Sequence, residues 1–553
     1  MRCTGAKIVL ECLKEQGVDT IFGYPGGTVL NIYDELYSCK DINCILTSHE
    51  QGASHGADGY ARATGKIGVC IATSGPGSTN LVTGIATAYM DSVPLVAITG
   101  QVPRSLIGKN SFQEVDIVEI TKPITKKSFM VKNIEELAKI LRTAFKLAKS
   151  GRPGPVLVDI PKDITSEEYE YTKVLLEEAI SIDVDSIQIQ QVSNIINSSK
   201  KPMIMVGGGC NISQCENELV SLQKKLKCPV CSTMMGLGAF NGNHKMYTGL
   251  VGMHGTVASN KVMTNCDVII AIGARFNDRV IGNSKSIKNH IKVVHIDIDK
   301  KEICKNVKAD YFVLGDAKEI LRDLNNKLQD RKENNWTNFA LELINKDLQK
   351  KVKIDSEIGV NPVYVVKKLY ELTKGQAIIS TEVGQNQIWT TQGYKFAKSR
   401  TFISSGGLGT MGYGLGAAIG ASIGTKKTVF NIAGDGSFRM NCNELATLKR
   451  YNLPVKVIIL NNNVLGMVRQ WQSLFYNKRY SHTTLERETD FVKIAEGYGV
   501  LGININKDSE VEEALLKAIN YQGPVVVDCF INENHMAVPI VPPGALIEDM
   551  LHS

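Results

Sequence analysis

Asp435 and Asn462 have the side-chain types and the spacing of a metal site. Asp435 stands between Gly434 and Gly436, and Asn462 lies 27 residues later in an asparagine triplet. The apolar runs TVFNIAGD and VKVIIL predict that each residue follows a β-strand of one parallel sheet, so both side chains are expected at the same sheet edge. Carboxylate and amide oxygens suit Mg²⁺ that shares a diphosphate, and the glycines let the backbone approach phosphate. The pattern predicts a magnesium and diphosphate site.

A second interpretation of this region is a nicotinamide dinucleotide site. Gly407, Gly409 and Gly412 spell GxGxxG after the strand-like TFISS, and Asp435 follows 23 residues after the last of them. An NAD-dependent dehydrogenase is therefore an alternative. Against it, Asp435 is enclosed by glycines and opens a predicted helix. The apolar face of that helix is expected to be Phe438, Cys442, Leu445 and Leu448. Strand, GDG, helix, strand and asparagines together favour a thiamine diphosphate motif.

Glu50 is the candidate for the catalytic carboxylate of such a site. Thiamine enzymes need a carboxylate that hydrogen-bonds the aminopyrimidine and promotes deprotonation of the reactive carbon. The strand-like NCILT ends at Thr47, and Glu50 opens the next predicted helix. A glutamate in a first helical turn is also explained by the helix dipole alone. Position by itself therefore leaves both explanations open.

The elements that must position these residues predict an α/β protein. In a chain of 553 residues, β-rich runs such as GVCIATSGPG and PVLVDIP alternate with helical patterns, which is typical of doubly wound parallel sheets. Charged, poorly periodic stretches at about 166–190 and 325–360 divide the chain. We expect three domains, at 1–165, 190–335 and 360–553. The first and third are candidates for two copies of one fold, although no sequence repeat is found.

Composition excludes several other classes of protein. The net charge is +7, and the basic residues do not gather with aromatic residues, so no nucleic-acid partner is expected. No apolar run approaches the ~20 residues of a membrane helix, and the start reads as a helix and a strand, so we expect a cytoplasmic protein without a membrane partner. The 13 cysteines are scattered. Cys228 and Cys231 form a lone CxxC, for which we expect buried, reduced thiols.

The motifs in this chain resemble those of the acetohydroxyacid synthases, also called acetolactate synthases. The matching segments run in order nearly from end to end: IFGYPGG, HEQGASHGADGYARATG, SGPGSTN, TGQVP, FQEVDIV, GRPGPVLVDIPKD, GMHGT, ARFNDRV, GLGTMGYG, GDGSF and GMVRQWQSLFY. The resemblance implies a pyrimidine-binding domain, a central FAD-binding domain that is Rossmann-like, and a diphosphate-binding domain. It also implies active sites between two subunits, in a homodimer or homotetramer, and a possible separate regulatory small subunit.

The resemblance assigns roles in cofactor binding. Glu50 would activate thiamine diphosphate, Met411 would hold it bent, and Asp435, Asn462 and the backbone carbonyl of Val464 would hold Mg²⁺. The other implied contacts are Glu382, Val383, Gly384, Gln385, Asn386, Gly434, Gly436 and Ser437. Asn386 stands where the family usually has histidine, which puts one phosphate contact in question.

The reaction implied by the resemblance joins the two-carbon unit of decarboxylated pyruvate to a second 2-ketoacid. The product is 2-acetolactate from a second pyruvate, or 2-aceto-2-hydroxybutyrate from 2-ketobutyrate. Arg279 would bind the acceptor carboxylate, which suits a bidentate guanidinium, and Trp471 would favour the larger acceptor. The other implied catalytic or pocket residues are Gly27, Phe112, Gln113, Lys162 and Met253.

The middle block carries the residues for the implied FAD, whose role in this family is structural or vestigial. The matched positions are Arg152, Gly207, Gly208, Gly209, Thr233, His254, Gly255, Arg275, Asp278, Asp297 and Asp316. Catabolic relatives lack the segment RFDDRV, which reads RFNDRV here, with Asn277 in place of an aspartate. An empty Rossmann-like spacer is the alternative for this block.

The rival functions are a pyruvate oxidase or another thiamine-dependent carboligase, the dehydrogenase above, and a non-catalytic binding paralogue. The presence of Glu50, Asp435 and Asn462 disfavours the paralogue.

Overall fold

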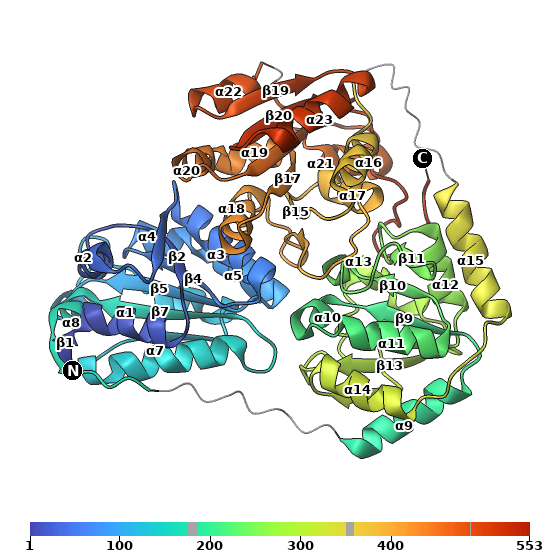
Figure 1. The fold of residues 1–553 in the computed structure, drawn as a ribbon, viewed down its shortest axis with the longest axis horizontal. Coiled ribbons are helices and arrows are strands. Elements are labelled where there is room, and N and C mark those ends of the chain that lie inside the picture. The colour runs from blue at the N-terminus through green and yellow to red at the C-terminus, as the bar shows by residue number, and fades with distance from the viewer. Residues whose placement is uncertain (175–184, 350–358, 487, 553) are drawn as a thin grey trace.

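Three six-stranded parallel sheets form the core of the protein and lie at the three corners of the chain (Figure 1). The computed structural model describes residues 1–174, 185–349, 359–486 and 488–552. Helices cover both faces of each sheet, which confirms the predicted α/β class with three doubly wound units.

The first sheet has the strand order β3-β2-β4-β5-β7-β6. Its strands are β2 (Thr20–Tyr24), β3 (Asn43–Leu46), β4 (Gly68–Ala72), β5 (Leu95–Gln101), β6 (Lys127–Met130) and β7 (Pro155–Pro161). One face is covered by α1 (Gly5–Glu15), α2 (Leu30–Ser38) and α7 (Ile134–Lys149), and the other by α3 (Glu50–Thr64) and α5 (Val82–Asp91). Shorter helices are α4 (Pro76–Asn80), α6 (Ile117–Thr121) and α8 (Lys162–Ser166).

The third sheet has the order β16-β15-β17-β18-β20-β19. Its strands are β15 (Ile378–Thr381), β16 (Phe402–Ile403), β17 (Val429–Gly434), β18 (Val455–Asn461), β19 (Leu501–Ile505) and β20 (Val525–Phe530). Its helices are α16 (Pro362–Thr373), α17 (Gln385–Gly393), α18 (Gly414–Thr425), α19 (Asp435–Asn441), α20 (Leu445–Arg450), α21 (Gly466–Phe475), α22 (Phe491–Gly497) and α23 (Val511–Asn520). Counted in chain order within each sheet, the first and third sheets share one strand order, so the two domains have the same topology.

The central sheet has the order β11-β10-β9-β12-β13-β14, which is the Rossmann arrangement with its switch point between β9 and β12. Its strands are β9 (Pro202–Val206), β10 (Val230–Ser232), β11 (Tyr247–Leu250), β12 (Val268–Ile272), β13 (Lys292–Asp297) and β14 (Tyr311–Leu314). The accompanying helices are α9 (Ser186–Ser198), α10 (Gly208–Ser213), α11 (Glu216–Leu226), α12 (Val257–Asn265), α13 (Asp278–Ile281), α14 (Ala317–Lys327) and α15 (Asn335–Leu348).

Three local features differ from the sequence prediction. The polar stretch at 325–360 contains α15, which packs on the central domain because Trp336 is buried there and its Nε1 donates to the carbonyl of Pro202 at 2.9 Å. Residues 168–170 form β8, which pairs antiparallel with β1 (Arg2–Thr4). The helix opened by Asp435 is broken into α19 and α20 by a 3₁₀ turn at Cys442–Glu444. Within the two predicted connectors, residues 175–184 and 350–358 lie outside the described residues.

Helices α3 and α18 join the first and third domains (Figure 1). A Cβ on Gly59 would lie 2.1 Å from the carbonyl oxygen of Ala417, and one on Gly420 would lie 1.8 Å from that of Gly56. Only glycine permits such an approach of two helix backbones, so these residues set the distance between the two domains.

The described residues include no helix long and apolar enough to span a membrane. Cys228 and Cys231 are buried free thiols, as expected from the scattered cysteines.

Candidate active site

Asp435 and Asn462 lie where the strand pattern placed them, at the carboxyl ends of two neighbouring parallel strands. Gly434, at the end of β17, pairs with Leu460 of β18, and Asn462 follows β18 directly. Asp435 is buried, and its Oδ2 has no hydrogen-bond partner among the described residues. Burial raises the pKa of Asp435 to about 7, although the backbone N–H of Asn462 donates to the carboxylate. A buried carboxylate with one oxygen left without a partner suits a bound cation.

The ligands that Mg²⁺ would find here are one carboxylate and neutral oxygens. Among the described residues no cluster of three or more His, Cys, Asp or Glu side chains could hold a metal. The Asn462 Oδ1 accepts from the Val464 N–H at 3.2 Å, which fixes the turn that carries both residues. Mg²⁺ prefers few carboxylates together with phosphate oxygens and water, so the donor set fits a cation that shares a diphosphate.

Two glycines at helix starts form the cradle beside this carboxylate. Gly384 precedes α17 with φ of 148°, and Gly434 precedes α19. Helix N-termini favour anions, and the glycines leave the backbone accessible. Gln385 does not point its side chain into the cradle, because its Nε2 donates to the Gln470 Oε1 at 2.8 Å and to the His535 carbonyl at 3.1 Å. The Gln385 Oε1 accepts from the Asn462 Nδ2 at 3.2 Å, so its side chain would position a candidate cation ligand, and only its backbone is left for the diphosphate.

Asn386 presents an acceptor to the cradle instead of a donor. Its Nδ2 donates to the carbonyls of Glu382 and Ile432, each at 2.9 Å. Carbonyls only accept, so the orientation of the amide is determined. The Oδ1 then lies 3.0 Å from the position of a Cβ on Gly384 and 3.4 Å from one on Gly434. The replacement of the family's histidine thus leaves this side chain without a free N–H for phosphate.

Glu382 holds the loop that carries Met411, residues 404–413 between β16 and α18, which we call the Met411 loop. Its carboxylate is fully buried and accepts from the N–H groups of Gly412 at 2.9 Å and Leu415 at 3.0 Å, and from the Ser437 hydroxyl at 2.6 Å. Burial raises the pKa of Glu382. The Ser437 hydroxyl is used in this network, so both residues tie the Met411 loop to the start of α19.

The glycine turn that resembles a dinucleotide fingerprint is already occupied by carboxylates. The N–H groups of Gly406 and Gly407 donate to Asp91 at 3.0 and 2.8 Å, and that of Gly412 donates to Glu382. A fingerprint binds pyrophosphate through free N–H groups at this position. The structure therefore gives no support to the dehydrogenase alternative at this turn.

A cavity of about 1590 Å³ lies at the switch point of the central sheet and is lined by residues of all three domains, including the ends of α1, α5 and α7 of the first. The predicted residues that line it are Arg152, Gly208, Gly209, Thr233, Met253, His254, Arg275, Asp278, Arg279, Asp297, Asp316, Val383, Gly384, Met411 and Trp471. Gly207 and Gly255 do not line it. A Cβ on Gly207 would meet the Gly273 carbonyl oxygen at 2.0 Å, and one on Gly255 would meet the Asn260 Oδ1 at 2.6 Å, so both glycines serve close packing.

Arg279, Trp471 and Met253 form one wall of this cavity. The guanidinium carbon of Arg279 lies 5.8 Å from the centre of the Trp471 ring, and its Nη1 lies 3.2 Å from the Met253 sulfur. Aromatic and sulfur contacts do not neutralise the guanidinium. Its acidic contact, Asp278 at 3.7 Å, is itself largely exposed. The Arg279 cation therefore remains available to an anionic group in the cavity.

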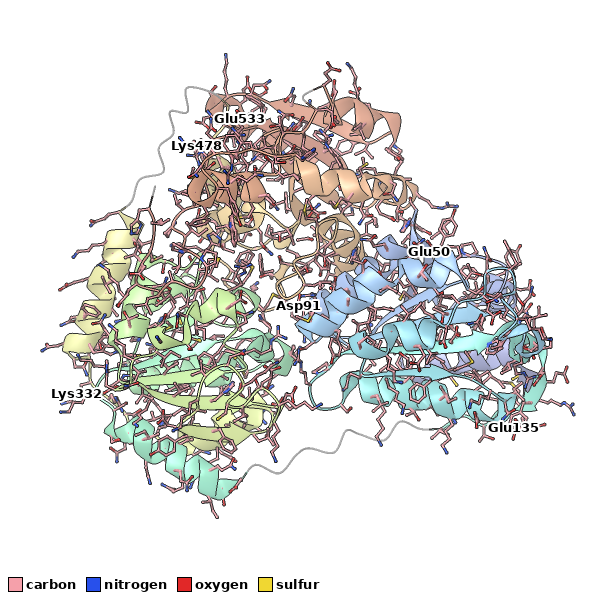
Figure 2. All side chains as sticks on the ribbon, turned by 180° about the vertical axis from the view of Figure 1, so that it is seen from behind. Glu50, Asp91, Glu135, Lys332, Lys478 and Glu533 are labelled. Atoms are coloured by element: carbon pink, nitrogen blue, oxygen red, sulfur yellow. The ribbon has the colours of Figure 1, made fainter. Side chains whose placement is uncertain are left out.

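The predicted catalytic residues of the N-terminal domain are not brought to this cavity. These are Glu50, Gly27, Phe112, Gln113 and Lys162, and none of them lines it. Phe112 is 88% exposed. The Glu50 Oε2 accepts from the Asn80 amide at 3.0 Å, on the side of the N-terminal domain that faces the third domain (Figure 2). One chain thus carries both halves of the predicted site, and neither Glu50 nor Asp435 lines this cavity.

Glu444 is a further residue that sequence reasoning missed. It is buried, and its carboxylate accepts from the N–H groups of Ser48 and His49 at 3.1 Å and from the Thr447 hydroxyl at 2.6 Å. A Cβ on Gly52 would lie 2.0 Å from its Oε1. The third domain thereby holds the start of α3, immediately before Glu50. The helical pattern at 438–448 marked only apolar positions, so no sequence signal identified this contact.

The fold and the site together define a class of enzyme. The structure has three parallel-sheet domains and a buried, glycine-flanked aspartate with one unpartnered carboxylate oxygen. The sequence also matches three family descriptions of the thiamine pyrophosphate enzymes: the N-terminal TPP binding domain (residues 3–120), the central domain (189–324) and the C-terminal TPP binding domain (382–529). The chain belongs to the thiamine pyrophosphate enzymes.

Within that family the chain belongs with the acetolactate synthase large subunits. It is 44% identical over 564 residues to a probable acetolactate synthase large subunit of Methanocaldococcus jannaschii, covering 99% of this chain and 95% of the relative. It is 43% identical to the acetolactate synthase large subunit of Buchnera aphidicola subsp. Schizaphis graminum, covering 99% and 98%. An acetolactate synthase of Arthrospira platensis is 44% identical, with coverage of 100% and 98%.

Proposed function

We propose that this chain is the catalytic subunit of an acetolactate synthase that condenses pyruvate with a second 2-ketoacid, the first common step of branched-chain amino acid biosynthesis. The observation that carries the proposal is the buried, unpartnered Asp435 carboxylate beside two glycine-started helices. The products are 2-acetolactate, or 2-aceto-2-hydroxybutyrate when 2-ketobutyrate is the acceptor.

Asp435, Asn462 and the Val464 carbonyl would hold Mg²⁺, and the backbone at Gly384 and Gly434 would hold the diphosphate. Thiamine diphosphate, when bound, supplies the electron sink that allows a 2-ketoacid to lose CO₂ and form a carbon nucleophile. Met411 lines the cavity near Gly436, where its methyl carbon lies 3.9 Å from the position of a Cβ. It is placed to contact the organic part of the cofactor beyond the diphosphate.

Arg279 would bind the acceptor carboxylate, because it is the cation on the cavity wall nearest Trp471. An ionised pair with bidentate hydrogen bonds orients a planar carboxylate well. Trp471 and Met253 would then contact the alkyl group of the acceptor and distinguish pyruvate from 2-ketobutyrate.

We further propose that the cavity at the central switch point holds FAD. The Rossmann strand order, the glycine turn at 207–209 and the cavity volume fit a dinucleotide. Asn277 retains the helix-capping role that an aspartate would have, because its side chain accepts from the Val280 N–H at 3.1 Å. Burial lowers the pKa of His254 to about 4, so a neutral imidazole faces the cavity.

We propose that the working enzyme is at least a homodimer in the cytoplasm. The support is the resemblance to a family whose active sites lie between two subunits, which would place the third domain of a second copy against Glu50. A regulatory small subunit is also proposed, because the relatives above are named large subunits.

The reaction is tested by adding pyruvate anaerobically to protein that carries thiamine diphosphate, Mg²⁺ and FAD. We expect acetolactate to accumulate while the flavin absorbance near 450 nm stays largely oxidised, because condensation has no net redox change. Rapid stoichiometric bleaching with formation of acetate would instead identify a pyruvate oxidase. A turnover that needs NADH and no thiamine diphosphate would identify the dehydrogenase.

We predict that Trp471→Leu lowers the preference for 2-ketobutyrate over pyruvate by about tenfold, since one methylene in an apolar pocket is worth about 1–3 kcal/mol. The measurement is the product ratio in a competition assay with both acceptors. Trp389→Leu, a buried tryptophan that does not line the cavity, is the control and should leave the ratio unchanged. An unchanged ratio in Trp471→Leu would remove this residue from acceptor selection.

A further inference from the structure

Three consecutive residues at the end of α5 lie where the three domains meet. Figure 2 shows the middle one, Asp91, close to the centre of the molecule. The Met90 carbonyl accepts from the Arg275 Nη1 at 2.6 Å, and the Ser92 hydroxyl accepts from the Arg152 Nε at 2.7 Å. Both arginines line the central cavity. The residue on each side of Asp91 is therefore held by an arginine side chain that faces the proposed flavin.

Arg152 connects this segment to the central domain. Its Nη1 lies 2.9 Å from the carboxylate of Glu302 and 3.5 Å from that of Asp299. Burial and the neighbouring charge of Arg152 lower the pKa of Arg275. Two arginines in one cavity wall repel each other, and an anionic ligand such as a pyrophosphate would relieve this repulsion and order both side chains.

Asp91 itself holds the loop that carries Met411. Its Oδ1 accepts from the Gly407 N–H at 2.8 Å, and its Oδ2 accepts from the Gly406 N–H and from the Arg62 Nη2, each at 3.0 Å. The carboxylate is fully shielded from solvent. Arg62 also donates to the Ser404 carbonyl at 3.0 Å. The Asp91–Arg62 ion pair therefore holds the start of the loop through both backbone N–H groups and a backbone carbonyl.

Further contacts from α5, Glu382 and the central domain restrain the same loop. The Thr410 hydroxyl pairs with that of Thr87 on α5 at 2.7 Å, and Gly412 is held by Glu382. A Cβ on Gly406 would lie 2.3 Å from the sulfur of Met235, a central-domain residue of the cavity wall. Leu408 and Gly409 are exposed to the cavity. The position of Met411 therefore depends on the end of α5 and on the residues that line the cavity.

We propose that Asp91 is a positioning residue that couples the central cavity to the thiamine site. A dinucleotide that contacts Arg152 and Arg275 holds these two side chains, which in turn hold Met90 and Ser92. Asp91 then has a fixed position, and its carboxylate holds Gly406 and Gly407 at the start of the Met411 loop. If the first ligand has already ordered these residues, the second ligand binds without the entropic cost of ordering them. The two ligands therefore bind cooperatively. The inference rests on the proposed function. It gives the flavin, which has no redox role in the condensation, a role in the binding of thiamine diphosphate.

Asp91→Asn is the most direct variant. An amide can present its oxygen to Gly406 and Arg62 or to Gly407, but not to both sides, so one glycine N–H meets an N–H donor. Asp159→Asn is the matched control. Asp159 is equally buried, but it accepts from Thr99 at 2.7 Å and Gln101 at 3.0 Å within the first sheet and does not contact the loop.

The experiment is a titration of the full-length protein with thiamine diphosphate and Mg²⁺ by isothermal calorimetry, with and without saturating FAD. For the natural sequence we expect FAD to tighten thiamine diphosphate binding by at least ~5-fold, the lower end of typical allosteric coupling. Asp91→Asn should reduce this ratio to within about twofold, and Asp159→Asn should retain it. Ser92→Ala removes only the Arg152 contact, and should reduce the ratio while leaving the affinity without FAD unchanged.

Several outcomes would overturn the inference. One is an FAD effect in Asp91→Asn or Ser92→Ala that equals that of the natural sequence, and another is a natural sequence that binds thiamine diphosphate equally well with and without FAD. The second result would leave the proposed function intact. A natural sequence that binds no thiamine diphosphate under either condition would refute the proposed function itself. If Asp91→Asn does not fold by circular dichroism, Ser92→Ala decides the question.

Discussion

Glu50→Gln is expected to lower turnover by at least ~10²-fold, the lower end of general acid–base contributions. The amide keeps the size of the side chain and can retain a hydrogen bond to Asn80, whose Nδ2 lies 3.0 Å from the Glu50 Oε2. It cannot exchange a proton with the aminopyrimidine ring. The loss should therefore fall on kcat, with cofactor affinity changed by less than the turnover.

The measurement is steady-state acetolactate formation together with cofactor affinity from fluorescence quenching. Glu119→Gln is the control, because Glu119 is an exposed glutamate on α6 in the same domain that pairs only with Lys122 at 3.3 Å. It should keep full activity. Turnover of Glu50→Gln within about threefold of normal, with saturating cofactor, would exclude Glu50 as the activating carboxylate.

The parallel-sheet class and the strand-end chemistry were accessible from the sequence because they depend on local patterns. The alternation of apolar strands with amphipathic helices predicted parallel sheets, and the glycines and asparagines at strand ends placed Asp435 and Asn462 together. Glu50 opens α3 as expected, since a glutamate in the first turn is favourable whatever else it does. These predictions need only the residue and its neighbours in the chain.

Asp91, Glu382 and Glu444 could not be predicted in this way. Each buried carboxylate binds backbone N–H groups of a distant segment: Gly406 and Gly407 for Asp91, Gly412 for Glu382, and Ser48 and His49 for Glu444. A backbone donor leaves no side-chain pattern in the sequence, so only the packing of the domains shows which donor is used. The same holds for Asn386, whose change from histidine is visible in the sequence but whose amide orientation is not.

The contact between the first and third domains was likewise not visible in the sequence. Helices α3 and α18 pack closely through Gly56, Gly59 and Gly420, which sets how the two domains of one chain contact each other. We propose that the catalytic contact between Glu50 and Asp435 is made with another copy.

This leads to a second prediction of large effect, which concerns Asp435→Asn. The variant has no anionic side-chain ligand at the cation site, and we expect it to lose activity by at least ~10²-fold at cofactor concentrations that saturate the natural enzyme, because the metal would help to hold the diphosphate. Activity that returns fully at high Mg²⁺ would show that Asp435 tunes affinity only. Asp490→Asn, at the exposed start of α22, is the control and should remain active.

Co-expression of Asp435→Asn with Glu50→Gln then tests how the site is assembled. If each site takes Glu50 from one chain and Asp435 from the other, a mixed dimer of the two inactive chains contains one intact site. Random pairing in a twofold-symmetric dimer makes half of the dimers mixed, so about a quarter of normal activity should return.

The double variant, with both changes in one chain, separates this result from assembly within a single chain. Co-expressed in equal amounts with the natural chain, it should leave about a quarter of the sites intact if sites form between chains, and about half if each chain is complete. Failure of the two single variants to restore activity, together with half activity in the second mixture, would place Glu50 and Asp435 in one chain's site.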